Sequence, residues 1–292
     1  MNIAVILAGG TGTRLGGDIP KQYMEVGGKP VIGYCLDTFF RHPSVDAVQI
    51  VAEECWREYI LKYIESIACV SKRNSDETIA ENTSRSTSKN ADSKTDEHTD
   101  HKENRNANYK GNWYTDHKEN IDIKWKGFSA PGSNRQLSIY HALEDCMAYA
   151  SPDDHVMIHD AARPLVSDAC IAASFEAVRR HDGVLPALPM KDTVYLSADG
   201  KRISSLLDRK QVFAGQAPET FHLGRYYEAN RALLPERIKE INGSTEPAIL
   251  AGLDVAVVEG DEGNFKITTA QDLERFRQKV AADAMHKTMY KE

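Results

Sequence analysis

The feature that most constrains this chain is a short apolar run that leads directly into a glycine-rich loop. Residues 3–6 read Ile-Ala-Val-Ile, which is typical of a strand buried on both faces of a parallel sheet. Residues 7–14 continue as Leu-Ala-Gly-Gly-Thr-Gly-Thr-Arg. Glycines directly after a buried strand leave backbone N–H groups available to phosphate oxygens. The sequence therefore predicts an anion-binding loop at the end of the first strand.

Two cations follow the glycines and narrow the ligand class. Arg14 closes the loop, and Lys21 follows within Ile-Pro-Lys-Gln over residues 19–22. A guanidinium and a mobile ammonium beside free amides suit a polyphosphate. A Walker loop is excluded, because no Gly-Lys followed by Ser or Thr occurs here, and a dinucleotide fingerprint is excluded because Leu15 takes the place of its third glycine. A turn that needs glycine only for its backbone geometry is the structural alternative.

Composition describes an ordinary globular chain in a reducing compartment. The 292 residues are 41% hydrophobic and 27% charged, and the net charge of -7 argues against a nucleic-acid partner. Five cysteines without a CxxC spacing indicate reduced thiols. Neither a signal peptide nor an apolar run of about 18 residues is visible, so we expect a cytoplasmic protein without a membrane partner.

A polar stretch interrupts the otherwise regular pattern. Between about residues 71 and 127, Ser, Thr, Asn, Asp, Glu and Lys dominate, and aliphatic residues almost vanish between Ile79 and Ile121. Such a composition cannot bury enough apolar surface to offset the entropy of ordering it. We therefore predict one domain over residues 1–292, interrupted by a disordered insertion at about 71–127.

Outside the insertion, strand and helix patterns alternate. Alternation of this kind predicts an α/β fold with a mainly parallel sheet flanked by helices, and with ligands at the carboxyl ends of the strands. A β-hairpin over about 191–213 breaks the pattern and must pack on something, a partner subunit being one candidate. The predicted strands cover residues 3–6, 47–52, 121–125, 155–159, 183–188 and 255–258, and the predicted helices begin near residues 30, 55, 137 and 270.

Two polar clusters follow the third and fourth predicted strands. Residues 132–135 read Gly-Ser-Asn-Arg, with Ser138 one turn later, and can hold a ribose or a base edge, or simply cap the helix through Asn134. Residues 159–164 read His-Asp-Ala-Ala-Arg-Pro. Asp160 is placed to hold Mg²⁺ against phosphates, although a structural ion pair with Arg163 is the alternative and the two are compatible. We expect His159 to be a packed core histidine.

Two further clusters lie toward the C-terminus. Lys-Asp-Thr over 191–193 and Asp-Arg-Lys over 208–210 stand at the two ends of the hairpin, which brings them together as a phosphorylated substrate or a solvated hairpin base would allow. Asn-Phe-Lys-Ile-Thr over 264–268 follows a turn rich in glycine and acids. Lys266 can therefore reach a phosphate that is being transferred.

These motifs, in this order, resemble those of one enzyme family. The loop over 7–14, Pro-Lys-Gln-Tyr over 20–23, His-Asp-Ala-Ala-Arg-Pro over 159–164 and Asn-Phe-Lys-Ile-Thr over 264–268 are similar to motifs of the 2-C-methyl-D-erythritol 4-phosphate cytidylyltransferases and of their relatives that act on ribitol 5-phosphate. The resemblance covers the chain outside residues 71–127. It implies a homodimer of Rossmann-like α/β subunits whose hairpin arms interlock, and the transfer of CMP from CTP, with Mg²⁺, to a small polyol phosphate.

The resemblance also implies a role for each matching residue. Arg14, Lys21 and Lys266 match the catalytic cations, and Arg209 matches the arm residue that reaches the neighbouring site. The nucleotide-binding positions are Ala8, Gly9, Gly10, Thr11, Gly12, Thr13, Gly132, Ser133 and Ser138, and the substrate-binding positions are Asp160, Arg163, Thr193 and Arg209, with Asp160 also the expected metal ligand.

Several departures leave the acceptor open. Ser133 stands where the family commonly has aspartate, Ala217 where it has threonine, and Ser244-Thr245 where a Thr-Asp pair is expected. The opening loop and the Asn-Phe-Lys ending favour the ribitol branch, whereas Asp-Ala-Ala-Arg-Pro favours the methylerythritol branch. We expect the methylerythritol phosphate, with ribitol or another polyol phosphate as the alternative. An inactive nucleotide-binding module is a third possibility, suggested by Ala217 and Thr245.

Overall fold

The computed structural model describes residues 1–10, 19–68, 121 and 124–289. The chain forms two compact units, one of residues 1–59 and 124–292 and the other of residues 60–123. Residues 54–68 are helical. Most of the predicted insertion lies outside the described residues, as do Thr11, Gly12, Thr13 and Arg14 of the glycine-rich loop. Everything that follows concerns the larger unit.

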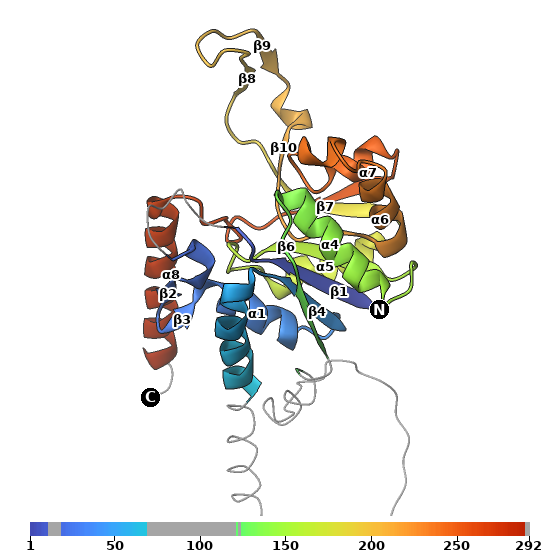
Figure 1. The fold of residues 1–292 in the computed structure, drawn as a ribbon. Coiled ribbons are helices and arrows are strands. Elements are labelled where there is room, and N and C mark those ends of the chain that lie inside the picture. Colours follow the sequence, from blue (N-terminus) through green and yellow to red (C-terminus); the bar gives the residue numbers. More distant parts are fainter. Residues whose placement is uncertain (11–18, 69–120, 122–123, 290–292) are drawn as a thin grey trace, which may run out of the picture. The chain divides into compact units, whose positions relative to one another are not determined.

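An eight-stranded mixed sheet organises this unit (Figure 1). Its strands run in the order β10-β7-β11-β6-β1-β4-β5, and β12 also pairs with β7. The pairs β1–β4, β1–β6, β4–β5 and β7–β12 are parallel, while β11 is antiparallel to β6 and β7, and β10 is antiparallel to β7. The strands are β1 (Asn2–Leu7), β4 (Ala47–Val51), β5 (Trp125–Ser129), β6 (His155–Asp160), β7 (Gly183–Pro189), β10 (Phe213–Gly215), β11 (Glu219–His222) and β12 (Val255–Glu259).

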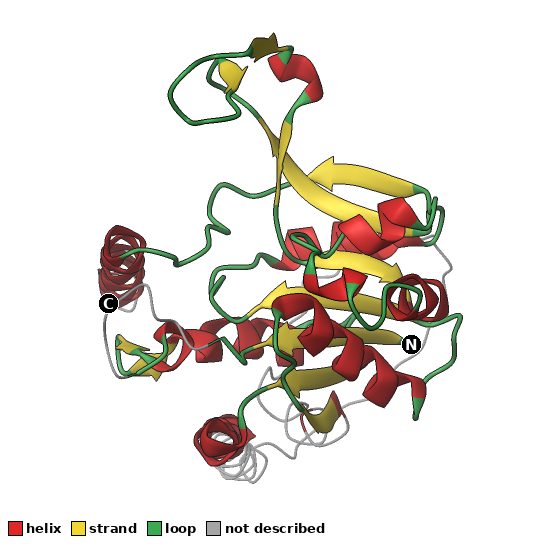
Figure 2. Cartoon of the chain, turned by 45° about the horizontal axis from the view of Figure 1, so that its top comes forward, coloured by secondary structure: helices red, strands yellow, loops and turns green. Residues whose placement is uncertain are grey.

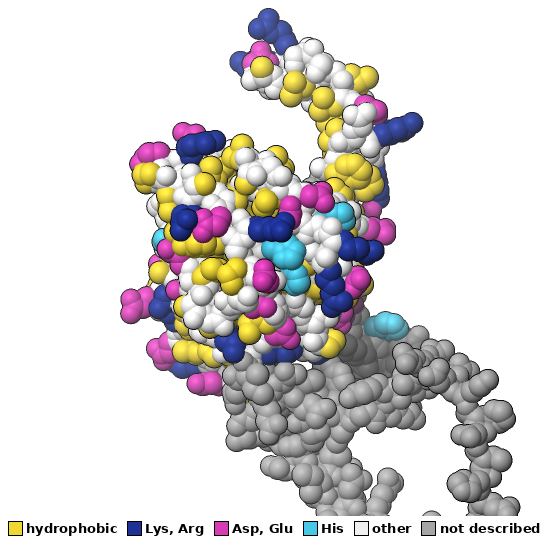
Figure 3. Space-filling view, turned by 90° about the vertical axis from the view of Figure 1, so that its right-hand side faces the viewer, with side chains coloured by type: hydrophobic (Ala, Val, Ile, Leu, Met, Phe, Trp, Pro, Cys, Tyr) yellow, Lys and Arg dark blue, Asp and Glu magenta, His cyan; other side chains and the backbone are white. Residues whose placement is uncertain are grey.

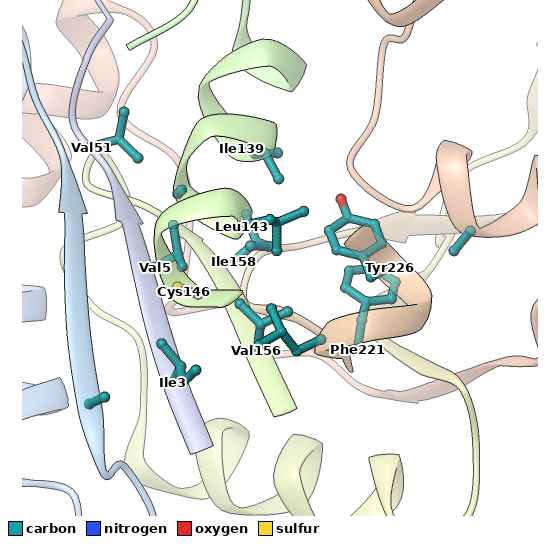
Figure 4. Close-up of a cluster of buried hydrophobic side chains, with 14 residues drawn as sticks. Ile3, Val5, Val51, Ile139, Leu143, Cys146, Val156, Ile158, Phe221 and Tyr226 are labelled. Carbon is teal, nitrogen blue, oxygen red and sulfur yellow. The ribbon is translucent and has the colours of Figure 1, made fainter. Parts of the chain in front are cut away.

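Helices cover the sheet on both faces (Figure 2). Successive side chains of a strand point to opposite faces, so β1 and β6 contribute to two cores. On one face, Ile3 and Val5 pack with Leu143, and the rings of Phe221 and Tyr226 stack with centroids 4.0 Å apart (Figure 4). Besides the helical residues 54–68, the main α-helices among the described residues are α1 (Val31–Arg41), α4 (Arg135–Met147), α5 (Asp168–Val178), α6 (Leu223–Arg231), α7 (Glu246–Leu250) and α8 (Ala270–Met289).

Smaller elements surround this frame. A short sheet of β2 (Glu25–Val26) and β3 (Lys29–Pro30) packs with α8 through a cluster that contains Val26 and Phe276. An antiparallel pair, β8 (Val194–Leu196) and β9 (Ser205–Leu207), projects from the end of β7 (Figure 1), and we call residues 191–213 the arm. In the part of the chain that the structure describes, the 3-10 helices are η2 (Lys21–Tyr23), η3 (Arg209–Gln211) and η4 (Arg237–Lys239).

The predicted architecture, a mainly parallel sheet flanked by helices, is confirmed, and one predicted strand is misplaced. The third strand was expected at 121–125, but Ile121 and Lys124 are helical and β5 starts at Trp125. The late start of β5 is explained by the Lys124 ammonium. It donates hydrogen bonds to the carbonyls of Phe40 (3.0 Å) and His42 (2.9 Å), which hold Lys124 at the end of α1. None of the described helices combines the length and the apolar character that crossing a bilayer requires.

Candidate functional site

The carboxyl ends of β1, β4, β5 and β6 surround a cavity of about 610 Å³. This is the edge at which ligands of a parallel sheet are expected. Both glycines of the described part of the loop line it, together with cationic and acidic side chains from distant segments. The lining residues are Leu7, Gly9, Gly10, Lys21, Gln22, Val51, Glu53, Gly132, Ser133, Asn134, Arg135, Ser138, Asp160, Ala162, Lys266 and Thr268.

The first wall of the cavity is the start of the glycine-rich loop. Ala8 is buried, and its N–H donates to the carbonyl of Val51 at 2.8 Å, so that β1 and β4 stay paired to their ends. Gly9 approaches the chain after β5 so closely that an added Cβ would lie 2.7 Å from Cβ of Pro131. Glycine at this position is therefore required by packing as well as by any ligand. Lys21 enters the same cavity from η2.

The centre of the site is Asp160, at the end of β6. Its Oδ1 accepts a hydrogen bond from Nε of Arg135 at 3.1 Å and forms an ion pair with Nη2 of the same residue at 3.0 Å, and its Oδ2 lies 2.9 Å from Nζ of Lys266. Arg163 adds a third cation, with Nε 3.9 Å from Oδ2. The ion pair between Arg163 and Asp160, the alternative raised by the sequence, is therefore present. One carboxylate thus gathers three cations at the floor of the cavity.

This environment fixes the charge of Asp160. Burial opposes ionisation of its carboxyl, but Arg135, Lys266 and Arg163 outweigh it and hold the pKa of Asp160 well below its usual range. A second acid, Glu219 at the start of β11, belongs to the same network: burial raises its pKa, which Arg135 partly offsets. Thr245 donates to Oε2 of Glu219 at 3.3 Å. Two acids and three cations leave a net positive charge, which suits an anionic ligand.

The start of α4 is held by its own polar side chains. Asn134 is the N-cap residue, and its Oδ1 accepts from the N–H of Leu137 at 2.8 Å. The amide of Gly132 donates to Oγ of Ser138 at 2.9 Å, and that hydroxyl donates to the carbonyl of Asn134. Asn134 therefore is the helix cap that the sequence allowed. Ser133 is exposed at the rim of the cavity.

A second set of bonds presents Lys266 to the cavity. The N–H of Ile267 donates to the carbonyl of Ala162 at 2.8 Å, and Nη1 of Arg163 donates to the carbonyl of Asn264 at 2.7 Å. His159 is fully buried and shares a 2.9 Å hydrogen bond with the carbonyl of Arg163, and burial lowers its pKa to about 4. It is the packed histidine expected from the sequence.

The arm residues do not join the cavity of their own chain. Thr193 and Arg209 are exposed, and neither is among the described residues that line the cavity. The hairpin does bring its two charged ends together as predicted, because Nη1 of Arg209 donates to the carbonyl of Lys191 at 2.9 Å.

Three residues in or beside the cavity escaped the assignments made from the sequence. Arg135 stood in a quoted motif without a role, Gln22 stood beside Lys21, and Glu219 carried no signal. Arg135 could have been found from the sequence, because it lies at the start of a predicted helix beside an expected phosphate site. Glu219 could not, because only the pairing of β11 with β6 brings it to Asp160.

The described residues contain no ready-made metal cage. Nowhere among them do three side chains of the His, Cys, Asp and Glu types come together. Glu53 and Asp160 are the acids that line the cavity, and Asp160 is already surrounded by cations. Mg²⁺ commonly binds through one or two carboxylates plus substrate phosphates, with several waters retained. The donor set therefore suits an ion that is held mainly by phosphate oxygens.

The chain is similar to known cytidylyltransferases. The family model for 2-C-methyl-D-erythritol 4-phosphate cytidylyltransferase (IspD) matches residues 2–80 and 123–280. A ribitol-5-phosphate cytidylyltransferase from Streptococcus agalactiae is 27% identical over 278 residues, which are 95% of this chain and 94% of that protein. A 2-C-methyl-D-erythritol 4-phosphate cytidylyltransferase from Syntrophotalea carbinolica is 28% identical over 279 residues, covering 94% of each chain.

Solved structures share the fold. The 4-diphosphocytidyl-2C-methyl-D-erythritol synthase of Anaerococcus prevotii superposes with a TM-score of 0.66, at 21% identity over 96% of both chains. The predicted enzyme class, a nucleotidyltransferase, is confirmed by the names of the relatives. The chain belongs to the IspD family of cytidylyltransferases.

Proposed function

We propose that this protein transfers CMP from CTP to the phosphate of 2-C-methyl-D-erythritol 4-phosphate and releases pyrophosphate. The observation that carries the proposal is the cluster in which Asp160 fixes Arg135 and Lys266 at the floor of a cavity that the glycine-rich loop opens into. Ribitol 5-phosphate is the second candidate acceptor, because a relative of that name matches 95% of the chain.

The reaction needs positioning and neutralisation of charge rather than a covalent enzyme intermediate. An oxygen of the acceptor phosphate attacks the α-phosphorus of CTP in line, and the bond between that phosphorus and the oxygen bridging to the β-phosphate breaks. Pyrophosphate then leaves with the negative charge. Lys21 and Lys266, with Arg14 in the loop outside the described residues, are the cations that we assign to stabilising this charge.

The other residues that line the cavity are assigned to the nucleotide and the acceptor. Gly9, Gly10, Gly132, Ser133 and Ser138 contact the nucleotide. Asp160 accepts a hydroxyl hydrogen of the acceptor, and Arg163 supports Asp160 from behind. Mg²⁺ neutralises the triphosphate when bound, with Asp160 as the predicted protein ligand.

A homodimer completes the proposal. The arm exposes large apolar side chains that a two-stranded hairpin cannot cover by itself, and Figure 3 shows such side chains along it. They are Tyr195, Leu196, Ile203, Leu206 and Phe213, which are 47–67% exposed. Thr193 and Arg209 then act in the neighbouring subunit's cavity, since they do not line their own. Sedimentation of the full chain and of a variant with Tyr195, Leu196 and Leu206 changed to Ser tests this: a wild-type monomer would contradict it.

The decisive test of function is pyrophosphate release from CTP with each acceptor in turn. Release with 2-C-methyl-D-erythritol 4-phosphate at a kcat/KM at least about tenfold above that with ribitol 5-phosphate supports the first candidate, since tenfold corresponds to about 1.4 kcal/mol of preference. The reverse ratio supports the second. Binding of CTP without release for any polyol phosphate would establish an inactive module instead.

A further inference from the structure

Gln22 is buried beside the nucleotide cavity and makes two hydrogen bonds that the proposed chemistry does not use. Gln22 lies in η2, next to Lys21, lines the cavity and is 3% exposed. Its Nε2 donates to the carbonyl of Ala8 at 2.7 Å and to the carbonyl of Gly10 at 2.6 Å. Both hydrogens of one amide group are thus committed to the glycine-rich loop.

The carbonyl of Ala8 is held twice. The hydroxyl of Tyr23 also donates to it, at 2.9 Å. A trans peptide is planar, with its carbonyl and its N–H pointing in opposite directions. Fixing the carbonyl of Ala8 against η2 therefore fixes the N–H of Gly9 on the opposite side, away from η2. Within the described part of the chain, that N–H has no acceptor.

The direction of these peptides decides whether the loop attracts or repels phosphate. A carbonyl oxygen turned toward a triphosphate would place two partial negative charges against each other, whereas an N–H would attract it. We propose that Gln22 is a positioning residue: it turns the carbonyls of Ala8 and Gly10 away from the polyphosphate and leaves the N–H of Gly9 to bind it. Because Gln22 and Lys21 are consecutive residues of η2, the same contacts anchor the backbone of Lys21 beside the loop.

This inference rests on the proposed function, since it assumes that the loop binds the triphosphate of CTP. It predicts a difference between the affinities for CTP and CMP that a purely structural role of Gln22 does not predict. Under the proposed function the loop binds the triphosphate, so the loss of Gln22 should weaken binding of CTP more than binding of CMP, which lacks the β- and γ-phosphates. A general loosening of the fold would weaken both nucleotides alike.

The informative substitution is Gln22→Glu, which keeps the shape but cannot donate while it is ionised. Its carboxylate would face two carbonyl oxygens, and we expect the Kd of CTP to rise about 10- to 100-fold at pH 8, with a change of about threefold or less for CMP. A protonated carboxyl donates one hydrogen bond. At pH 5.5, Gln22→Glu should therefore recover part of its CTP affinity relative to the wild type, whereas Gln22→Met should not.

Gln49→Glu is the matched control. Gln49 is also 3% exposed, but its Nε2 donates to Oγ of Ser129 at 3.0 Å, away from the glycine-rich loop. This variant should lower thermal stability while the ratio of the CTP and CMP affinities stays at the wild-type value.

Calorimetric titration with CTP and with CMP, after circular dichroism shows each variant folded, gives the result. A selective loss for CTP in Gln22→Glu and Gln22→Met supports the assignment. Equal losses for both nucleotides, or wild-type CTP affinity in either variant, overturn it. If Gln22→Glu does not fold, Gln22→Met decides alone. A wild-type protein that binds no CTP would instead refute the proposed function.

Discussion

Replacing Arg135 by methionine tests whether the Asp160 cluster is assembled by that guanidinium. The change removes the hydrogen bond from Nε to Oδ1 of Asp160, the ion-pair contact of Nη2 with the same oxygen, and the hydrogen bond to Oγ of Ser244. Breaking a buried ion pair costs about 3–5 kcal/mol. Here Asp160 keeps Lys266 and Arg163, and the Arg135 side chain is 33% exposed, so we expect a loss nearer 2 kcal/mol.

The assay is equilibrium unfolding in urea, followed by far-UV circular dichroism. A loss of about 2 kcal/mol corresponds to a fall in Tm of about 4–8 °C for a chain of this size. The matched control is Arg231→Met, which breaks an exposed pair with Glu228 on α6 and should change stability by less than about 0.5 kcal/mol.

The dependence on pH gives a second readout. Because the cations depress the pKa of Asp160, their stabilisation is present above the pKa of an unfolded aspartate, about 3.9, and is lost as the pH falls toward the folded value. The difference between wild type and Arg135→Met should therefore shrink below about pH 4. Equal stability of Arg135→Met and Arg231→Met at pH 7 would refute the view that Arg135 assembles the cluster.

Further predictions concern the other parts of the molecule. Lys266→Ala should lower kcat for pyrophosphate release by about 10²–10³ while the protein stays folded, and near-normal turnover would remove Lys266 from the mechanism. EDTA should abolish pyrophosphate release and excess Mg²⁺ should restore it, whereas EDTA-resistant release would exclude the ion. Asp272 accepts hydrogen bonds from Thr268 and Thr269 at the start of α8. Burial alone would raise the pKa of Asp272, but these hydrogen bonds outweigh it and lower the pKa to about 2. Asp272→Asn should therefore cost about 1 kcal/mol in urea unfolding at pH 7, and the cost should disappear as the pH falls from about 4 toward 2; an undiminished cost at pH 2 would contradict the assignment. Deleting residues 74–119 should leave both unfolding free energy and pyrophosphate release near their wild-type values, because the chain re-enters the sheet at the amino end of β5, and loss of either would show that this segment does more than connect.

The sequence predicted most of what depends on neighbouring residues. The run over 3–6 and the glycines after it located β1 and the cavity edge, and alternating patterns located β4, β6, β7 and β12. These signals are strong because a strand buried on both faces needs an uninterrupted apolar run. Pairs of isoleucines can mislead, however: Ile121 and Ile123 suggested a strand that starts only at Trp125.

Contacts between residues far apart in the chain could not be predicted from the sequence pattern. Asp160 and Lys266 were each assigned to the site, but their 2.9 Å pairing, and the pairing of Arg135 with Asp160, arise only when β6, α4 and the segment before α8 meet. The strand β11 escaped as well. Its four residues, Glu-Thr-Phe-His, show no apolar run, and it is a strand because β6 and β7 hold it on both edges.

The reversed direction of β11 brings a second acid to the edge of the sheet at which β6 ends. Parallel strands such as β1 present the loop that follows them, which here offers glycine amides, whereas β11 presents the segment that precedes it. The first residue of β11, Glu219, interacts electrostatically with Arg135, and the segment before it uses the carbonyl of Ala217 to hold Asn264 at 2.7 Å. Arg135 is therefore attracted by two carboxylates, Asp160 at the end of β6 and Glu219 at the start of its antiparallel neighbour. Reversing one strand thus adds a second negative charge to the group that holds this guanidinium.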